Sequence, residues 1–497
     1  MPPRSTYLEL SEDAGSAHKF YEVVVADTEV TITYGRIGER GQTKVTAFAT
    51  AGKAEAAAAK KIAEKVRKGY APAVRGVRQR RTVTRRTMLV SSVGSAGSGS
   101  GGSVTRAHVP SARRAPVLWR FSSGAAAFGI FVDDQRAWVG NQNGDVYTVA
   151  HDGTVTGHFR LPDGVKCIVA DDFWIYAGAD DGNVYDLSGK VPRLAYEIAD
   201  DVDIYWLDIH DGVLGVSDRA GRITMIDHED EFQWARKSDG DSAWMVRCDR
   251  DAVYHGHSRG VARYDTADGA PVWHTKVRGQ VLFGWQERDD VYAGTSHNQV
   301  YRLDKADGAI GAVYDCDGAV FSCAAAPDGR FVFAGDNHSS IYCFDRGGAR
   351  LWKLDTGCGS AFSMQYLDDR LYIVTTNGTL ACVDASEEAI RAAQEGSVPE
   401  PVDVKAAAGL AVVEPSVVLD SVTESTLITD GDGVVVECVR DGDRLRVRVV
   451  TPGYEPLWNV QFPKNVREPG ARYVVQEVRS SERGGFYRAY GEIRRLL

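Results

Sequence analysis

The sequence predicts a mainly β protein, in which a seven-bladed β-propeller follows a small α+β head and precedes a β-rich, barrel-like C-terminal domain. Three observations support this prediction. A pattern of strand, small residue, polar turn and strand recurs seven times in the middle of the chain. The turns hold Gly, Asn and Asp, which β-turns favour. Charge also divides the 497-residue chain into a basic beginning, an acidic middle and a mildly basic end.

The head is predicted at residues 1–76. The runs 20–27 and 29–35 are β-branched and aromatic, with an acidic turn between them, which indicates a hairpin. Residues 43–49 supply a third strand. Residues 50–70 are rich in Ala, Lys and Glu, which favour a helix. The head is therefore expected to pack one helix on a small sheet.

A propeller is predicted after a linker. Residues 77–115 are basic and rich in Gly and Ser, which is typical of a flexible tether. Within residues 116–386, the third positions of the seven repeats lie 37 to 41 residues apart. Four strands fit that period, so seven repeats predict seven blades. Residues 116–121 resemble the last strand of later blades, which the seventh repeat lacks, and we expect them to close the ring.

A second periodicity marks one residue in each repeat, usually an aromatic one. These residues recur every 38 to 41 positions, which predicts a set of side chains near the propeller axis. Two interpretations stay open: the side chains pack between the blades, or they line a channel mouth that holds a ligand or a partner peptide. The seven candidates are Phe128, Lys166, Trp206, Trp244, Phe283, Phe321 and Phe362.

The end of the chain predicts a connector and a further β domain. Residues 387–408 indicate a short acidic helix and a Pro/Val-rich connector, and residues 409–497 indicate a partly open barrel. Arg444, Arg446 and Arg448 alternate with apolar residues, so one face of their strand is basic and the other belongs to the core. The predicted strands are 433–440, 444–450, 472–479 and 485–493.

The charge distribution separates a head that suits polyanions from a body that avoids them. Residues 1–116 hold 20 Lys/Arg and 9 Asp/Glu, a net charge of +11. Residues 437–497 hold 12 and 8, a net charge of +4. Subtracting both from the total of −10 leaves −25 for the residues between them. The basic ends are therefore the parts expected to bind a nucleic acid.

Composition and motifs give no sign of catalysis. The first residues lack the apolar run of a signal peptide, and no run reaches the roughly 18 apolar residues of a membrane span, so we expect a cytoplasmic protein. The eight cysteines form no C-x-x-C pair, which favours buried reduced thiols over disulfides or a zinc site. No nucleophile elbow, P-loop, H-E-x-x-H or dinucleotide fingerprint is present. We expect no enzymatic activity, no catalytic residue, no bound metal and no cofactor.

Residues 34–42, Y-G-R-I-G-E-R-G-Q, form a candidate anion site. Glycine lets a backbone approach a ligand, arginine suits phosphate, and a tyrosine ring can stack on a base or sugar. Taken alone, the stretch fits a solvated turn equally well. The DNA-binding candidates are Tyr34, Gly35, Arg36, Arg40, Lys44 and Lys19, with Lys60, Lys61, Lys65 and Lys68 of the predicted helix adding charge nearby.

Residues 5–70 resemble a WGR domain, a module found in several poly(ADP-ribose) polymerases and in many bacterial proteins. The matching features are K-F-Y (19–21), Y-G-R-I-G-x-x-G-Q (34–42), the Ala/Lys-rich helix and K-G-Y (68–70). In those polymerases the aromatic residue and the arginine of the motif contact DNA at ends or nicks. The resemblance assigns these roles to Tyr34 and Arg36. Tyr replaces the motif's Trp and stacks over less area, and the chain carries no polymerase catalytic domain.

Residues 116–386 resemble the quinoprotein-like (PQQ-like) propellers. The resemblance rests on the repeated V-x-x-G-x-x-x-G-x-V-Y pattern and on a Trp-bearing outer strand. Quinone-dependent enzymes of that family usually have eight blades, a secretion signal and calcium ligands near the axis. The present sequence predicts seven blades without such a cluster. The resemblance therefore implies a platform for protein–protein interaction.

Together these features predict a bacterial, non-enzymatic DNA-binding scaffold. The head is expected to contact DNA, as at the ends or nicks of damaged DNA, while the propeller recruits a protein partner and neither touches a membrane. Two alternatives remain open. One is a protein-interaction hub that does not bind DNA. The other is a propeller that senses a small ligand in its central channel.

Overall fold

The structure is a computed structural model that describes most of the chain. The described residues are 4–11, 18–36, 42–67, 70–72, 113–171, 174–189, 191–198, 204–228, 232–415, 421–422, 433–442, 444–463, 466–481 and 485–496. They divide into two compact units. The first contains the N-terminal head, and the second contains the propeller together with the C-terminal barrel.

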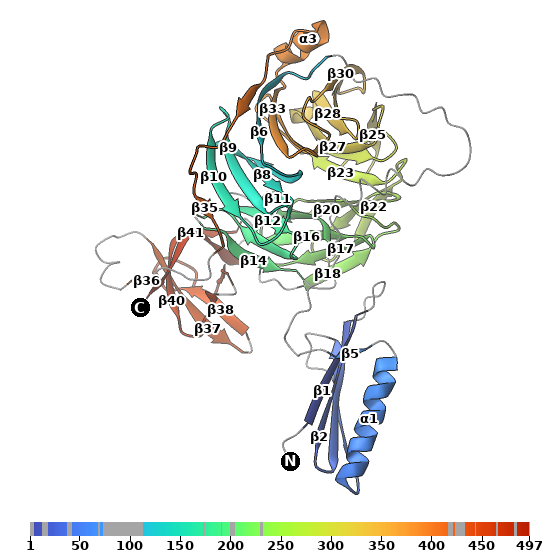
Figure 1. Ribbon diagram of the computed structural model, residues 1–497, viewed down its shortest axis with the longest axis vertical. Coiled ribbons are helices and arrows are strands. Elements are labelled where there is room, and N and C mark those ends of the chain that lie inside the picture. The colour runs from blue at the N-terminus through green and yellow to red at the C-terminus, as the bar shows by residue number, and fades with distance from the viewer. Residues whose placement is uncertain are drawn as a thin grey trace, which may run out of the picture. The chain divides into compact units, whose positions relative to one another are not determined.

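The head is an antiparallel five-stranded sheet with one helix beside it (Figure 1). Its strand order is β4-β3-β2-β1-β5. The helix presents Ala54 and Ala58 to Tyr21 and Val23, and such small residues let helix and sheet approach closely. The predicted hairpin, third strand and helix are confirmed, whereas β1 and β5 were not predicted. The elements are β1 (Arg4–Ser11), β2 (His18–Ala26), β3 (Glu29–Arg36), β4 (Gln42–Ala47), α1 (Ala51–Arg67) and β5 (Ala71–Pro72).

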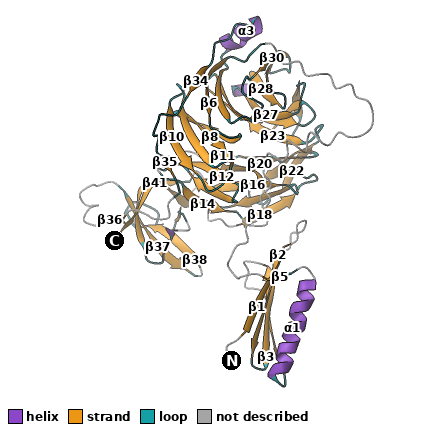
Figure 2. Cartoon of the chain, viewed as in Figure 1, coloured by secondary structure: helices purple, strands orange, loops and turns teal. Residues whose placement is uncertain are grey.

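Seven blades of four antiparallel strands follow, as predicted (Figure 2). Blades 1 to 3 consist of β7 (Ala127–Val132), β8 (Arg136–Asn141), β9 (Asp145–Ala150) and β10 (Val155–Arg160); β11 (Val165–Asp171), β12 (Trp174–Ala179), β13 (Asn183–Asp186) and β14 (Arg193–Glu197); and β15 (Ile204–His210), β16 (Val213–Asp218), β17 (Arg222–Ile226) and β18 (Phe232–Lys237). Blades 4 and 5 consist of β19 (Met245–Cys248), β20 (Ala252–His257), β21 (Gly260–Asp265) and β22 (Pro271–Thr275); and β23 (Val281–Gln286), β24 (Asp290–Thr295), β25 (Gln299–Asp304) and β26 (Ile310–Asp315).

Blades 6 and 7 complete the ring, and the last strand of blade 7 comes from the start of the propeller sequence. Blade 6 consists of β27 (Val320–Ala325), β28 (Phe331–Asp336), β29 (Ser340–Asp345) and β30 (Arg350–Asp355), with the short 3₁₀ helix η1 (Pro327–Gly329) after β27. Blade 7 consists of β31 (Ala361–Leu367), β32 (Arg370–Thr375), β33 (Thr379–Asp384) and β6 (Val117–Ser122). β6 pairs with β33, placing Trp119 opposite Cys382, so the predicted closure is confirmed.

The inner strands of six blades carry a β-bulge one residue after they begin. A bulge leaves one residue of a strand unpaired and redirects its side chain. These unpaired residues are Phe128, Lys166, Tyr205, Leu282, Phe321 and Phe362. Five of the six join Trp244 and Ala319 in one buried cluster to which six different blades contribute. The cluster therefore lies where the blades converge.

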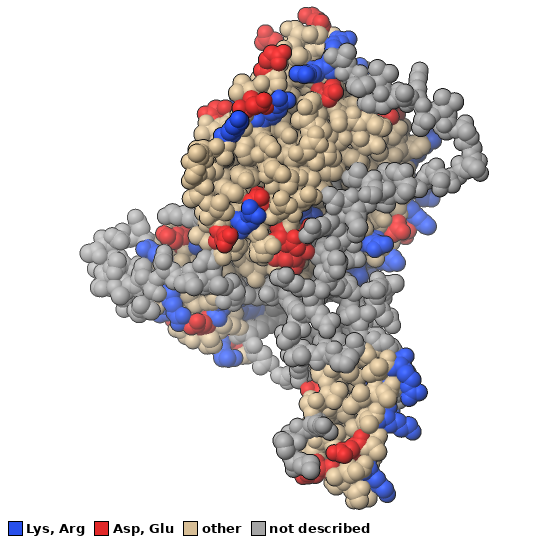
Figure 3. Space-filling model, in the orientation of Figure 1, with Lys and Arg blue, Asp and Glu red and all other residues tan. Residues whose placement is uncertain are grey.

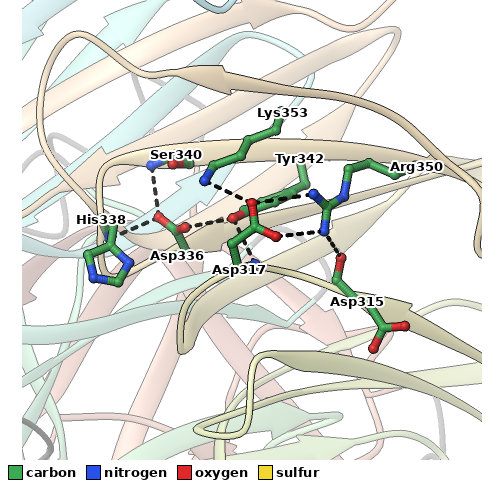
Figure 4. A network of polar contacts seen from close by, with 8 residues as sticks. All are labelled: Asp315, Asp317, Asp336, His338, Ser340, Tyr342, Arg350 and Lys353. Carbon is green, nitrogen blue, oxygen red and sulfur yellow. Dashed lines mark hydrogen bonds and ion pairs between the residues drawn. The ribbon is translucent and has the colours of Figure 1, made fainter. Parts of the chain in front are cut away.

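A buried polar side chain shapes the turn between the second and third strand of a blade. In blade 6 the Asp336 carboxylate accepts hydrogen bonds from the backbone N–H groups of His338 and Ser340, at 2.8 and 2.9 Å, and from the Tyr342 hydroxyl (Figure 4). Asn141 and Asp218 hold the corresponding turns of blades 1 and 3. These interactions give a structural reason for the polar residue that these repeats share at the start of the turn.

The connector after blade 7 adds a helix and two short strands to the propeller. α3 (Glu387–Glu395) begins at Ser386, whose hydroxyl accepts a hydrogen bond from the Ala389 N–H, and ends at Gly396 with a φ of 86°. β34 (Val402–Val404) and β35 (Val412–Val413) follow, and each adds a fifth strand to a blade. β34 pairs in parallel with β6 of blade 7, and β35 pairs in parallel with β10 of blade 1.

The C-terminal barrel is closed, where the sequence analysis expected a partly open one. Its strands run in the order β41-β39-β38-β37-β40, and β40 pairs again with β41. That final pairing depends on two strands curling toward each other, which no local pattern reveals. The strands are β36 (Ser421–Val422), β37 (Val434–Asp441), β38 (Arg444–Val449), β39 (Asn459–Gln461), β40 (Arg472–Ser480) and β41 (Phe486–Leu496).

Arg488 joins the barrel to blades 2 and 3. Its side chain is 1% exposed, and its two terminal nitrogens lie 2.7 Å from the Asp171 carboxylate and 3.0 Å from the Asp211 carboxylate. The indole N–H of Trp174 donates to the Ala489 carbonyl at 3.2 Å. The Phe486 ring stacks on His228. The barrel is thus packed onto the propeller largely by β41, and β39 adds a hydrogen bond of 2.8 Å from the Gln461 amide to the Tyr196 hydroxyl.

Candidate nucleic-acid interface

Backbone register places four of the predicted DNA-binding positions on one face of the head. β2 and β3 pair Tyr21 with Tyr34 and Lys19 with Arg36. Opposite residues share a face, as do residues two apart on one strand. Tyr21 packs in the core beneath α1, so all four positions belong to the helix-covered face. Lys44 lies opposite Ile32 and belongs to the same face.

Tyr34 is the exposed aromatic residue of this face. It is 41% exposed, and its ring centroid lies 6.2 Å from that of the buried Tyr21. Tyr21 in turn meets the edge of Tyr70, at 6.3 Å. Tyr21, which itself packs against Tyr70, therefore lies beside Tyr34, and a large part of Tyr34 remains exposed to solvent.

Lys65 brings a positive charge to the same place. Its ammonium group lies 4.5 Å from the centroid of Tyr21 and 5.1 Å from that of Tyr70. Cation–π contacts of this kind restrict a lysine that would otherwise move freely. Tyr21 and Tyr70 come from the two ends of the domain, K-F-Y and K-G-Y, and only the folded structure shows that they enclose Lys65 together.

Further cations surround this face. Figure 3 shows Lys and Arg side chains along the side of the head that α1 occupies in Figure 1. The cationic side chains that are exposed on α1 and β4 are Lys44, Lys53, Lys60, Lys61 and Arg67. A face with an open ring and several ammonium groups has the parts that stacking and phosphate binding require.

Several predicted residues are placed only in part. Gly35 and Arg36 end β3, and Lys19 lies in β2. Gly35 pairs with Phe20, so its position belongs to the opposite face of the sheet from Tyr34. Arg40 and the glycine-rich residues around it lie outside the described residues.

The predicted axial residues are all buried. Each is between 2% and 8% exposed, and they contact one another or neighbouring blades. Phe362 stacks on Phe128 with ring centroids 4.7 Å apart, and Trp244 stacks on Tyr205 at 3.9 Å. Lys166 pairs with Asp180 at 3.1 Å.

The predicted axial positions of Trp206 and Phe283 are wrong. In blades 3 and 5 the bulged residues are Tyr205 and Leu282, so Trp206 and Phe283 lie one position beyond the bulge. Their rings meet each other instead, with centroids 5.6 Å apart. The sequence alignment placed aromatic residues in equivalent positions, whereas the bulge decides which residue reaches the axis.

The described residues contain no group of three or more His, Cys, Asp or Glu side chains that could hold a metal ion. The eight cysteines are buried free thiols, as the sequence predicted. In the parts of the chain that are described, no helix is long and apolar enough to cross a membrane.

Comparisons with known proteins support two of these regions. Residues 4–77 match the WGR domain, and residues 218–311 match the family described as outer membrane protein assembly factor BamB. The solved structures that resemble the chain include the WD40 β-propeller domain of Doa1, with 11% identity, a TM-score of 0.48, and coverage of 55% of this chain and 98% of that one. The computationally designed Ika8 protein has 12% identity, a TM-score of 0.46, and coverage of 55% and 99%. No curated protein matches the chain.

Proposed function

We propose that this WGR-containing propeller protein is a non-enzymatic DNA-binding scaffold. Its head contacts DNA at ends or nicks, and its acidic propeller recruits a protein partner. The observation that carries the proposal is Tyr34, a ring that is 41% exposed on the face of a WGR domain that also holds Lys65 and Lys44.

The contacts suggest separate roles for ring and cations. An exposed ring stacks on a terminal or unpaired base, and such stacking is tolerant of sequence. Ammonium groups beside it contact backbone phosphates and release counterions from the duplex. A site of this kind prefers DNA structures in which a base face is accessible, which are ends and nicks rather than continuous duplex.

Binding of the full chain to nicked, blunt-ended and closed circular duplex tests the proposal at two salt concentrations. We expect Tyr34→Ala to weaken binding to nicked DNA by about 1–3 kcal/mol, because a stacking contact is lost. The logarithm of the binding constant falls linearly with the logarithm of the salt concentration. We expect Lys44→Ala to make this slope shallower by about 0.9, the contribution of one phosphate contact. Arg288→Ala, which removes an exposed charge from a turn of the propeller rather than from the head, serves as the control.

Two results would contradict the DNA-binding role. One is absence of duplex affinity at low salt, and the other is affinity that is indifferent to both Tyr34 and Arg36. If a protein partner still binds the head after nuclease treatment, and Tyr34→Ala abolishes that binding, the head belongs to a protein-interaction hub instead.

A further inference from the structure

The propeller already accepts extra strands on its outer edges. β34 pairs in parallel with β6 of blade 7, with Val402 opposite Trp119, Asp403 opposite Arg120 and Val404 opposite Phe121. β35 pairs in parallel with β10 of blade 1. In blade 6, Arg114 forms a parallel bridge to Asp355 at the end of β30. Three blades therefore bind an extended piece of this chain in one orientation.

Blade 4 has an outer edge without such a strand. In the part of the chain that the structure describes, β22 ends its sheet and no fifth strand pairs with it. Val272 on this strand is 51% exposed. An unpaired strand edge with an exposed apolar side chain is a template for another strand.

The register of β22 matches that of the edge that β34 occupies. Trp119 and Trp273 each follow the bulge of their strand, opposite the third strand of the blade. Their indole N–H groups make equivalent bonds to the next blade: Trp119 donates to the His151 carbonyl at 3.0 Å, and Trp273 donates to the Lys305 carbonyl at 3.1 Å. Trp273, His274 and Thr275 are therefore equivalent to Trp119, Arg120 and Phe121.

Charge at the pairing position indicates which residue a partner would present. On blade 7 the Arg120 guanidinium holds the Asp403 carboxylate, with Nη2 and Oδ2 3.2 Å apart. At the corresponding position of blade 1, His158 lies opposite Val412 of β35, and its ring forms a hydrogen bond of 2.8 Å with the Asp145 carboxylate of its own blade. Blade 4 has His274 there, and its ring lies 3.6 Å from the exposed Asp239 carboxylate. The position can therefore face a carboxylate.

The surroundings of β22 keep positive charge available. Arg259, Lys276 and Arg278 are exposed, and among the described residues none of their side chains forms an ion pair. Blade 6 differs, because Arg350 and Lys353 of its outer strand both bind Asp317 (Figure 4). Figure 3 shows Lys and Arg side chains on the side of the propeller where Figure 1 labels β22.

We propose that the outer edge of β22 binds an extended segment of a partner protein as a parallel fifth strand. The segment carries an acidic residue between two apolar ones, like V-D-V at 402–404, and its carboxylate lies opposite His274. Main-chain hydrogen bonds supply affinity in this mode, and alternate side chains supply specificity. The proposal identifies the recruiting surface of the propeller and in that respect rests on the proposed function.

Charge complementarity favours this occupant over three others. The chain's own linker stretch 77–86 is strongly basic and is repelled by Arg259, Lys276 and Arg278. A second copy of the same edge meets the same repulsion. A nucleic acid would use the charges but would leave the backbone groups of β22 and the Val272 side chain without partners.

A labelled peptide with the sequence of residues 397–406, S-V-P-E-P-V-D-V-K-A, tests the proposal on the full chain by fluorescence anisotropy. We expect saturable binding, loss of binding when Pro replaces the peptide's Asp, and slower amide exchange at residues 273–275. His274→Glu should weaken binding at least about tenfold, because like charges then face each other at the strand. Val272→Lys, which places a charge on the edge, should weaken it as well. Arg288→Glu, which also introduces a glutamate, at an exposed turn of blade 5, should leave binding unchanged.

Each alternative gives a distinct contrary result. Equal peptide binding by wild type and His274→Glu would overturn the proposal. Slow amide exchange at residues 273–275 before the peptide is added would also overturn it. Self-association that Val272→Lys abolishes would assign the edge to a second copy. A loss of duplex affinity in His274→Glu would assign it to DNA. Duplex binding is measured on the same variants and on Tyr34→Ala. If the peptide does not bind, the duplex measurements still test the role of the head by themselves.

Discussion

At the scale of single residues, His255 is a buried imidazole that the fold keeps neutral. It is fully buried, and neither ring nitrogen has a hydrogen-bond partner among the described residues. Burial, together with repulsion from His257, lowers the pKa of His255 to about 3. Burial and the neighbouring His274 lower the pKa of His257 to about 4. Below a pH of about 6.5, the ordinary pKa of histidine, the unfolded chain protonates these two histidines. In the folded protein they stay neutral until the pH is much lower.

This difference makes stability depend on pH. A histidine whose pKa is lowered by folding does not reduce the free energy of unfolding at pH values above its unfolded-state pKa. As the pH falls below the unfolded-state pKa, it reduces that free energy progressively. Between pH 7 and pH 5, His255 alone should lower the free energy of unfolding by about 2 kcal/mol. Urea denaturation at both pH values should therefore show a smaller loss for His255→Phe than for wild type. His297→Gln, at an exposed histidine, should behave as wild type. Equal losses in all three proteins would refute the assignment.

At the scale of elements, β41 joins the barrel to the propeller through the buried Arg488. We expect Arg488→Ala to destabilise the second unit by about 3–5 kcal/mol, because two buried carboxylates then lose their counter-charge. Arg495 lies on the same strand, pairs with Glu468 at 2.6 Å and is 40% exposed. Arg495→Ala should cost no more than about 1 kcal/mol. Chemical denaturation of both variants measures the difference, and equal costs would contradict a docking role for Arg488.

The blades could be predicted from the sequence because each one repeats the same local signals. Strand, small residue and polar turn recur within 37 to 41 residues, and the strand at 116–121 resembles the outer strands of other blades. Features set by long-range register could not be predicted. The bulges that bring Tyr205 and Leu282 to the axis, and the β40–β41 pairing that closes the barrel, depend on partners distant in the chain. The same holds for Lys65, whose place beside Tyr21 and Tyr70 depends on how α1 packs.

At the scale of the whole molecule, opposite charges separate the parts that can approach DNA. Residues 1–116 carry +11 and residues 117–436 carry −25. Phosphates are attracted to the first region and repelled by the second, at distances up to the Debye length of about 8–10 Å. Under the proposed function, DNA is bound by the head while the propeller stays available to a protein partner.

We therefore expect DNA contacts to be confined to the basic ends of the chain. Photo-crosslinking of the full chain to nicked duplex, followed by mass spectrometry, should place crosslinks within residues 1–116 and, if the barrel participates, within 437–497. The chain should bind DNA even though the acidic residues of the propeller keep their charge, because those residues lie outside the DNA contact. Tyr34→Ala should remove the crosslinks nearest the nick while leaving those of the basic stretch 77–86. Crosslinks within residues 117–436, above all at β22, would show that the propeller itself touches DNA and would contradict this separation of roles.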